Sequence, residues 1–167
     1  MFNVGLIRVI TLDEAQGLNT HGQLIESLYP DIAVESVCIP NQPEGIHSPE
    51  QTDEAIPKIV QVARECFANK DMILVSCAED PGVEEIRAAM PGMPVTGGGE
   101  CAVAAALRYG ERVGVLGIVD YAPKAYRRLL GDRLVGNFRP EGVNCTLDLQ
   151  TPEGHDSCVR TAQAMAE

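Results

Sequence analysis

Basic residues are scarce in this sequence. Its 167 residues include 24 Asp and Glu against 13 Lys and Arg, which gives a formal net charge of −11 at pH 7. Most of the imbalance lies in residues 1–97, with 15 acids and 5 bases (net −10), whereas residues 98–167 hold 9 acids and 8 bases (net −1). A field of this sign repels phosphate backbones. We therefore expect no nucleic-acid partner.

Long apolar runs are also missing. No segment approaches the roughly 20 apolar residues that a membrane-spanning helix needs, and no basic N-terminal region leads into an apolar stretch with a cleavage site. The apolar share of 45% and the charged share of 22% are typical of a soluble globular protein. We expect a cytoplasmic protein with no membrane partner.

Common metal and nucleotide signatures are absent. The six cysteines form no Cys-x-x-Cys pair, and the three histidines share no metal-ligand spacing with one another or with the cysteines. There is no P-loop, no Gly-x-Gly-x-x-Gly fingerprint and no Gly-x-Ser-x-Gly elbow. We therefore expect reduced thiols and no metal site.

Short apolar runs alternate with helical patterns along the chain, which predicts an α/β fold. The expected architecture is a parallel sheet with helices on both faces and right-handed crossovers. We expect a first α/β domain over residues 1–97 and a partial second α/β domain over residues 98–167. The expected strands are 4–10, 32–39, 72–76, 93–96, 112–118 and 134–138.

Several helix starts carry recognisable signals. Ser48-Pro49-Glu50-Gln51 has the form of a capping box with Pro at the first helical position, and Pro57 should break or kink the helix that follows. Asp80 followed by Pro81 predicts the N-cap and first residue of another helix. Thr151-Pro152 predicts the start of the last helix.

The run Met72 to Ser76 organises the candidate site. It predicts a buried parallel strand, which leaves Cys77 on the strand-to-helix loop. In an open parallel sheet that is the carboxyl edge, where ligands bind. A thiol near helix-start N–H groups ionises more easily, and the thiolate is the reactive form. The alternative interpretation is a small buried apolar cysteine.

The second candidate segment is Gly97-Gly98-Gly99, which opens a helix from Glu100 to about Tyr109. Three glycines let the backbone approach a ligand closely, and the N–H groups behind them suit a carboxylate, an imide oxygen or a phosphate. A tight turn that needs positive φ explains the same glycines without a ligand. Cys101 lies in the first turn of this helix, where a thiol is acidified, but it is equally explained as a packing residue.

These segments together resemble the aspartate/glutamate racemase superfamily, in particular its hydantoin racemase branch. The resemblance is carried by Ser76-Cys77-Ala78-Glu79-Asp80-Pro81-Gly82, Gly97-Gly98-Gly99-Glu100 and Arg112-Val113-Gly114-Val115-Leu116, and it runs from about Val4 to the last residue. It implies two flavodoxin-like halves and a racemase or epimerase that needs no cofactor. In the family one cysteine thiolate removes an α-proton and a second cysteine delivers a proton from the opposite face. Cys77 matches the first.

The sequence departs from the family at two places. The second cysteine lies in a Cys-Thr-Gly or Cys-Ala-Gly segment on a strand that would follow the last helix here, and this chain contains no such segment. Many members have an Asn-Pro-Asn-like turn after the first strand, whereas this chain reads Arg8-Val9-Ile10-Thr11. Of the substrate contacts there we retain only Thr11, and we consider Cys101 as the second acid.

The first functional hypothesis is a racemase acting on a small molecule with an acidic carbon beside a carbonyl, such as a 5-substituted hydantoin. Cys77 is the catalytic residue, and the substrate-binding residues are Thr11, Ser76, Ala78, Gly97, Gly98, Gly99 and Ile118. Activity would be impaired if the chain ends at residue 167. The alternative is a catalytically incomplete fragment or a domain that binds a small anion or self-assembles. A weaker third hypothesis is a thiol hydrolase or redox protein. An unpaired edge strand predicts a homo-oligomer.

Overall fold

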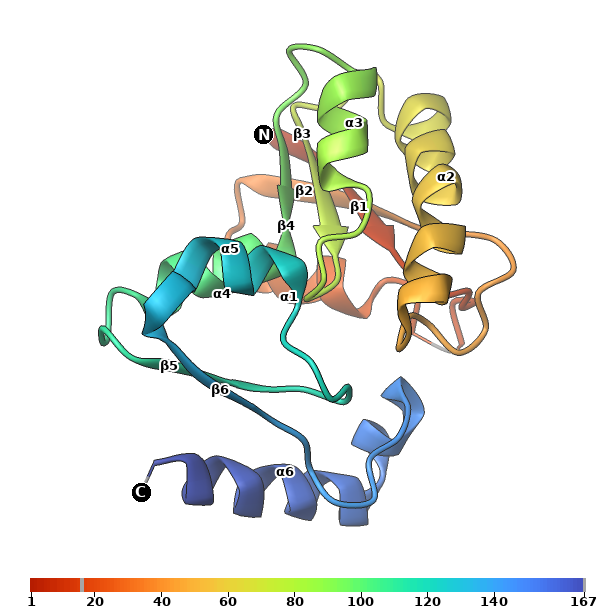
Figure 1. Cartoon of the computed structure of the whole chain (residues 1–167). Helices are drawn as coiled ribbons and strands as arrows, with labels where there is room; N and C mark the ends of the chain where they lie inside the picture. The colour runs from red at the N-terminus through yellow and green to blue at the C-terminus, as the bar shows by residue number, and fades with distance from the viewer. Residues whose placement is uncertain (16, 167) are drawn as a thin grey trace. The chain divides into compact units, whose positions relative to one another are not determined.

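The computed structural model describes residues 1–15 and 17–166 (Figure 1). Contacts between residues divide the chain into two compact units, Met1–Gly98 and Gly99–Glu167. The expected first domain over residues 1–97 and partial second domain over residues 98–167 stay a prediction. Among the described residues, no helix combines the length and the apolarity needed to cross a membrane.

The first unit is built on a parallel sheet of four strands. Its elements are β1 (Phe2–Arg8), α1 (Thr20–Leu28), β2 (Ile32–Cys38), α2 (Pro49–Cys66), β3 (Met72–Ser76), α3 (Val83–Ala89) and β4 (Val95–Gly97), and α4 (Gly98–Ala106) begins at its last residue. The strand order is β2-β1-β3-β4 with every pair parallel. This is the order of a doubly wound sheet whose ligands bind at the carboxyl ends of the strands. The predicted α/β class is confirmed.

Helices cover both faces of this sheet. On one face, Gly22 of α1 lies so close to β2 that a Cβ there would approach the Ser36 Oγ to 2.8 Å and the Val34 Cγ1 to 3.1 Å. On the other face, α2 and α3 bury a core that includes Ile7, Ile59 and Ile73. Successive residues of a strand point to opposite faces. Alternate residues of the strands therefore face α1 on one side of the sheet and α2 and α3 on the other.

Helix α2 begins as the sequence predicts but does not break where expected. The Ser48 Oγ accepts a hydrogen bond from the Gln51 N–H at 3.3 Å, and Pro49 occupies the first helical position. The Gln51 side chain accepts from the His47 N–H at 2.8 Å, one residue earlier than a regular capping box. The helix continues through Pro57, so the expected break is wrong, while the alternative of a kink stays a prediction. Burial of its apolar face outweighs the backbone bond that proline removes.

The strand bounds confirm the sequence pattern in the middle of the chain and correct it at the start. The expected strand over 72–76 coincides with β3. The first strand, expected over 4–10, ends instead at Arg8, and Val9 and Ile10 are buried in the loop that follows. The prediction continued the strand through Val9 and Ile10 because they are apolar. An apolar, buried residue can belong to a strand or to the loop beside it.

The second unit contains a parallel pair of strands. It comprises most of α4, then β5 (Val113–Leu116), α5 (Lys124–Leu130), a short 3₁₀ helix (Gly131–Arg133), β6 (Leu134–Phe138), a second 3₁₀ helix (Thr146–Gln150) and α6 (Pro152–Met165). Phe138 packs over Gly114 and Gly136, and the Met165 Cε lies 2.8 Å from where a Gly114 Cβ would be. Thr151 caps α6 as predicted, accepting from the Gly154 N–H at 3.0 Å.

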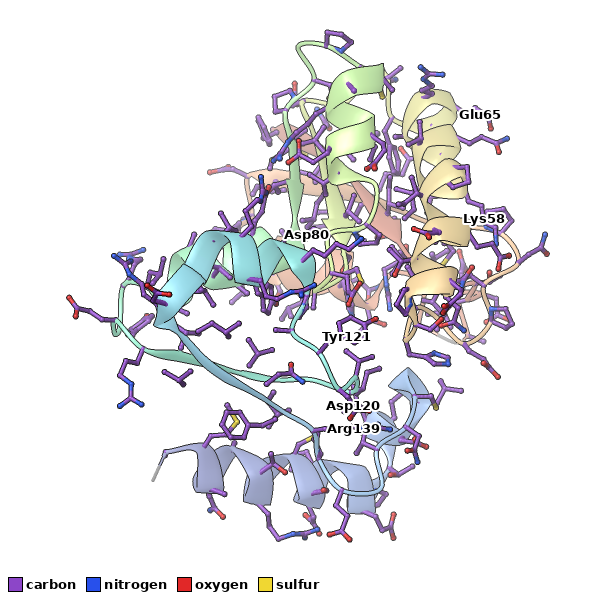
Figure 2. The ribbon with its side chains drawn as sticks, in the orientation of Figure 1. Lys58, Glu65, Asp80, Asp120, Tyr121 and Arg139 are labelled. Atoms are coloured by element: carbon purple, nitrogen blue, oxygen red, sulfur yellow. The ribbon has the colours of Figure 1, made fainter. Side chains whose placement is uncertain are left out.

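An ion pair and its hydrogen bonds hold the loops of the second unit. The Arg139 guanidinium donates to both oxygens of Asp120, at 3.1 and 3.2 Å, and to the Asn144 Oδ1 at 2.7 Å (Figure 2). The Asp148 Oδ2 accepts from the Asn144 and Cys145 N–H groups at 2.7 and 3.0 Å. Charged side chains therefore hold the segment between β6 and α6 in place.

Candidate active site

Three polar side chains end three adjacent strands at the carboxyl edge of the first sheet. Arg8 ends β1, Cys38 ends β2 and Ser76 ends β3, and the register places Arg8 beside both of the others. Cys38 shares its face of β2 with Ser36, which lies under α1. Register partners in a parallel sheet share a face, so all three lie on the α1 side of the sheet.

Cys77 follows directly on β3 and lies in the β3–α3 loop. Its N–H donates to the Val75 carbonyl at 3.0 Å, and its carbonyl accepts from the Asp80 N–H at 3.3 Å. Its side chain is partly exposed and packs against the core on the α2 and α3 side. The thiol is therefore neither sealed in the core nor fully in solvent, and the predicted position on the strand-to-helix loop is confirmed.

The loop is longer than the sequence indicated. Helix α3 begins at Val83 with Gly82 as its N-cap at φ 76°, and Asp80 is in the left-handed region at φ 53°. The expectation that Asp80 caps the helix with Pro81 as its first residue is therefore wrong. The Ile86 N–H donates to the Gly82 carbonyl at 2.8 Å, so the N-cap lies two residues after the position expected for it. The extra turn keeps Cys77 away from the first turn of α3.

Burial changes the ionisation of Cys77 in the direction opposite to the one expected. Removal from water raises the pKa of this thiol from 9.0 to about 12. The Glu79 N–H, and to a smaller extent the Ala78 N–H, oppose the rise by hydrogen bonding to the sulfur, while the charges of Glu79 and Asp80 add to it. The expectation of an easily ionised thiol is wrong for the free protein, because desolvation outweighs the two backbone donors.

The glycine segment passes over this loop. A Cβ on Gly98 would lie 3.2 Å from the Cys77 carbonyl oxygen, and a Cβ on Gly97 would collide with the Asp80 carboxyl group. Neither these two residues nor Gly99 has a positive φ. The explanation by a turn that requires positive φ is therefore wrong, and close approach of backbone to the Cys77 loop is what requires glycine at 97 and 98.

Thr11 connects two loops at the same edge. Its Oγ1 donates to the Ile39 carbonyl at 2.8 Å and accepts from the Gln42 N–H at 2.7 Å. The Gln42 side chain in turn donates to the Gly45 carbonyl at 2.9 Å. The Thr11 hydroxyl therefore hydrogen-bonds the loop after β1 to the loop after β2. A role for Thr11 in substrate binding stays a prediction.

Two residues beside the site were not identified from the sequence. The His21 Nδ1 lies 2.7 Å from the Ser76 Oγ, and the Arg8 Nη1 donates to the carbonyls of Gly17 and Leu18 at 3.1 Å each. Partial burial lowers the pKa of His21 below its ordinary value, and the Arg8 charge lowers it further. Arg8 was missed because the predicted first strand ran past it to Ile10. His21 lies 55 residues from Ser76, and no local signal connects them.

Three predicted site residues lie in the second unit. Gly99 and Cys101 belong to α4, where Cys101 is exposed, and Ile118 follows β5 just after Gly117, whose N–H donates to the Phe138 carbonyl at 3.0 Å. Cys101 as a second acid and Ile118 as a lining residue stay predictions. No group of three or more metal-ligating side chains occurs among the described residues.

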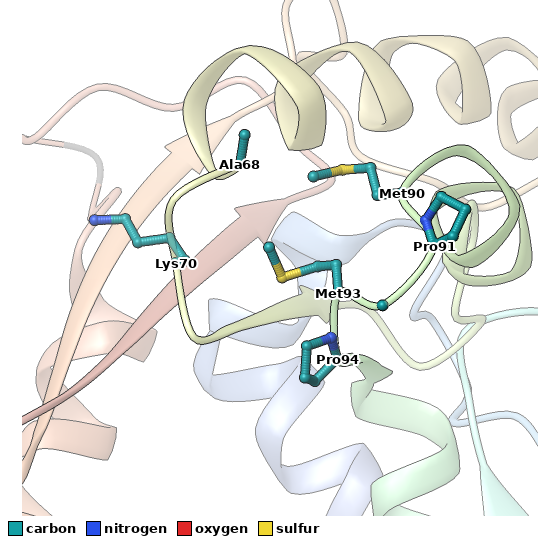
Figure 3. Close-up of a pocket in the computed structure, with 7 residues that line it drawn as sticks. Ala68, Lys70, Met90, Pro91, Met93 and Pro94 are labelled. Atoms are coloured by element: carbon teal, nitrogen blue, oxygen red, sulfur yellow. The ribbon is translucent and has the colours of Figure 1, made fainter.

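Two hollows of the first unit lie away from Cys77. One, of about 340 Å³, is formed by Ala68, Lys70, Met90, Pro91, Gly92, Met93 and Pro94 (Figure 3). These residues precede β3 and β4, so this hollow is at the amino edge of the sheet. The other, of about 500 Å³, follows α2 and is lined by Ile56, Pro57, Val60, Gln61, Arg64, Glu65 and Glu85. Neither contains a residue predicted for the site.

The sequence matches the family profile described as Asp/Glu/Hydantoin racemase over residues 21–166. The chain belongs to this family. The match includes His21, Ser76, Cys77 and the glycine segment, whereas β1 with Arg8 precedes it. The predicted resemblance is thereby confirmed at the level of the racemase family.

Solved structures of racemases have the same fold. Allantoin racemase from Klebsiella pneumoniae is similar with a TM-score of 0.78 and 16% sequence identity, covering 100% of this chain and 70% of that one. Allantoin racemase from Pseudomonas fluorescens gives a TM-score of 0.77 and 16% identity, with coverage of 99% and 72%. At this identity the likeness shows the fold alone. A comparison with curated proteins found no match.

Proposed function

We propose that this racemase-family protein exchanges the α-proton of a 5-substituted hydantoin or a related amino-acid derivative, with Cys77 as the group that gives and takes the proton. The observation that carries the proposal is the placement of Cys77 at the carboxyl edge of a doubly wound sheet, under the glycine segment, in a chain of the racemase family. Allantoin is itself a 5-substituted hydantoin, which makes it the first substrate to test.

The ionisation of Cys77 suggests how the step runs. With a pKa of about 12 the sulfur carries its proton in the free protein at neutral pH. The enolate forms when a base on the opposite face removes the original α-proton. As an acid, the Cys77 thiol then gives its own proton to the α-carbon and becomes a thiolate, which the Glu79 and Ala78 N–H groups stabilise. In the reverse direction the thiolate takes the α-proton and the electron pair moves onto the carbonyl oxygen. We infer that substrate binding supplies the environment in which the thiolate forms.

Inversion requires a second group on the opposite face of the carbon. Cys101 is the residue that we propose for this role, because it is a thiol in the first turn of α4 immediately after the glycine segment. The neutral carbonyl of the ring delocalises the negative charge of the intermediate, and backbone N–H groups near Gly97 and Gly98 would stabilise it. No cofactor is needed for this chemistry.

Solvent deuterium exchange tests the proposal. Enantiomerically pure allantoin is incubated with the protein in D₂O, α-deuteration is followed by NMR, and inversion by circular dichroism, each against buffer alone because hydantoins exchange slowly without catalyst. Cys77→Ser should reduce exchange by about 10²- to 10⁴-fold, the usual contribution of a positioned acid or base. Cys66→Ser is the control, since this exposed thiol ends α2 away from the site.

The outcomes separate the roles of the two thiols. Full exchange activity in Cys77→Ser would contradict the proposal. Cys101→Ser should retain exchange and lose inversion if its thiol is the second acid, whereas unchanged inversion would remove Cys101 from the mechanism. No exchange above the blank with allantoin, other 5-substituted hydantoins, aspartate or glutamate would favour the alternative of an incomplete or binding-only α/β protein.

A further inference from the structure

Among the described residues of the first unit, Arg8 is the partly buried cation without a carboxylate partner. Residues 1–97 contain 15 acids and 5 bases. Three of the bases make ion pairs: Lys58 with Glu54 at 2.9 Å, Lys70 with Glu35 at 2.6 Å and Arg87 with Glu84 at 2.9 Å. Arg64 is exposed on α2. Among the described residues no acid pairs with Arg8, although acids outnumber bases threefold in this part of the chain.

A charge in this position is costly unless something compensates it. Burial lowers the pKa of Arg8, and the charge of the neighbouring Cys38 opposes that effect only in part. Removing a guanidinium from water without an opposite charge costs free energy that an apolar residue at the end of β1 would not. The position is the carboxyl edge of the sheet, one strand from Ser76 and next to the loop of Cys77.

The guanidinium is also held in place. Its Nη1 donates to the Gly17 and Leu18 carbonyls at 3.1 Å each, which uses two of the five N–H groups. The three N–H groups on Nε and Nη2 have no acceptor within residues 1–15 and 17–166. A fixed guanidinium edge with spare parallel donors matches the two oxygens of a carboxylate. Fixing the donor beforehand lowers the entropy lost on binding.

A polar neighbour lies beside this edge. The Ser76 Oγ, in register with Arg8 on the adjacent strand, is 2.7 Å from the His21 Nδ1, and His21 comes from the helix whose entry Arg8 ties down. We propose that the Arg8 guanidinium, with the His21–Ser76 pair beside it, is a subsite for a carboxylate of the substrate. This inference rests on the proposed function, and it names the substrate class as a carboxylate-bearing compound rather than a neutral hydantoin.

The charge of the protein favours a carboxylate over a phosphate as the occupant. Residues 1–97 carry a net charge of −10, which opposes a dianion more strongly than a single negative charge. Among the described residues of the first unit, no second Lys or Arg ends a strand beside Arg8, and one guanidinium balances one carboxylate. The ligand we infer therefore has one free carboxylate and, at a different atom, the acidic carbon that reaches Cys77.

The test compares two ligands that differ in charge and little in shape, 5-carboxymethylhydantoin and its neutral amide, 5-carbamoylmethylhydantoin. Calorimetric binding to the whole chain should give about ten- to a hundredfold higher affinity for the carboxylate, the range expected for a charge-assisted hydrogen-bonded pair. The preference should shrink as salt is raised. Equal affinities for the two ligands in the wild-type protein would overturn the inference.

Variants identify the residue responsible. Arg8→Gln should abolish the preference for the carboxylate, and Arg64→Gln, which removes a cation of the same type from the exposed side of α2, should leave it unchanged. Because Arg8 also ties the loop before α1, folding is checked by circular dichroism. If Arg8→Gln does not fold, Arg8→Lys keeps the charge and loses the fork, and its preference should fall severalfold. A folded Arg8 variant with the full wild-type preference contradicts the subsite.

The proposed function and this inference fail in distinguishable ways. A preference that depends on Arg8, with no α-deuteration of either ligand above the blank, supports the subsite and contradicts the racemase mechanism. Equal binding of both ligands, with α-deuteration that Cys77→Ser removes, supports the mechanism and overturns the subsite. Phosphate competing as well as acetate for the site in the wild-type protein would overturn the assignment to a carboxylate.

Discussion

Burial and the carboxylates of Glu79 and Asp80 destabilise the thiolate form of Cys77, and the backbone N–H groups of Glu79 and Ala78 stabilise it. The net result is a pKa of about 12, raised from 9.0. The folded protein therefore holds this proton over a pH range in which the unfolded chain has released it. The contribution of the protonated Cys77 thiol to the unfolding free energy is fully present below pH 9.0. It is lost as the pH rises from 9.0 toward 12.

This linkage predicts an alkaline phenotype for one residue. Between pH 8 and pH 10.5 the wild-type protein should lose about 1 to 2 kcal/mol more unfolding free energy than Cys77→Ala, because the variant has no thiol to deprotonate on unfolding. Urea denaturation at the two pH values measures the difference. The same pH-dependent loss in both proteins would show that Cys77 ionises in the folded state as readily as in the unfolded chain.

Local residue patterns predicted the position of Cys77 on the loop after β3 and the helix caps at Ser48 and Thr151. Each of these features depends on residues only a few positions away. The pKa of Cys77 was predicted in the wrong direction. Helix-start donors are visible in a sequence, but the depth of burial and the nearby carboxylates of Glu79 and Asp80 are set by packing. The His21–Ser76 contact was equally out of reach, because it joins side chains 55 residues apart.

At the scale of elements, α2 ends directly on β1. A Cβ added to Gly5 would overlap the ring of Phe67, which caps the end of α2 and is fully buried. Because Gly5 has no side chain, the Phe67 ring at the end of α2 packs directly on the backbone of β1. The sequence shows the glycine inside an apolar strand but gives no reason for it.

Gly5→Ala should therefore destabilise the protein by about 1 to 3 kcal/mol, the usual cost of forcing extra volume into a packed core. Gly110→Ala is the control, because a Cβ there would have no atom closer than 3.9 Å and the residue has no positive φ. Thermal unfolding of both variants measures the contrast. Equal stability of the two variants would mean that Phe67 moves without cost.

Element boundaries followed the sequence best where the chain is most regular. The strand over 72–76 and the strand over 134–138 were predicted at the bounds found. The first strand was placed two residues late, and the start of α3 was placed too early. The loop after β1 is fixed by the hydrogen bonds of Thr11 to Ile39 and Gln42, and the loop before α3 lies against Gly97 and Gly98.

At the scale of the whole molecule, self-association stays a prediction. The second unit has two paired strands, and a two-stranded sheet is marginal by itself. Several of its apolar side chains are exposed in the single chain, namely Tyr109 (92%), Leu129, Val135 and Val159. Exposed strand edges and apolar side chains favour pairing with another chain.

Sedimentation at micromolar concentration should therefore give a dimer or a larger species. Val135→Glu on β6 should shift it toward monomer, whereas Leu28→Glu, a similarly exposed apolar side chain on α1, should not. A wild-type protein that sediments as a stable monomer would contradict this prediction. An effect of Leu28→Glu equal to that of Val135→Glu would place the interface elsewhere.

The sequence by itself determined the parallel α/β class, the loop that holds Cys77 and the family to which the chain belongs, because alternating periodicity and short motifs are local properties. Only the tertiary structure decided which strand ends are neighbours, so that Arg8 lies between Cys38 and Ser76 with His21 next to them. It also decided the protonation of Cys77. Both depend on register and burial, and these are fixed by contacts between segments far apart along the chain.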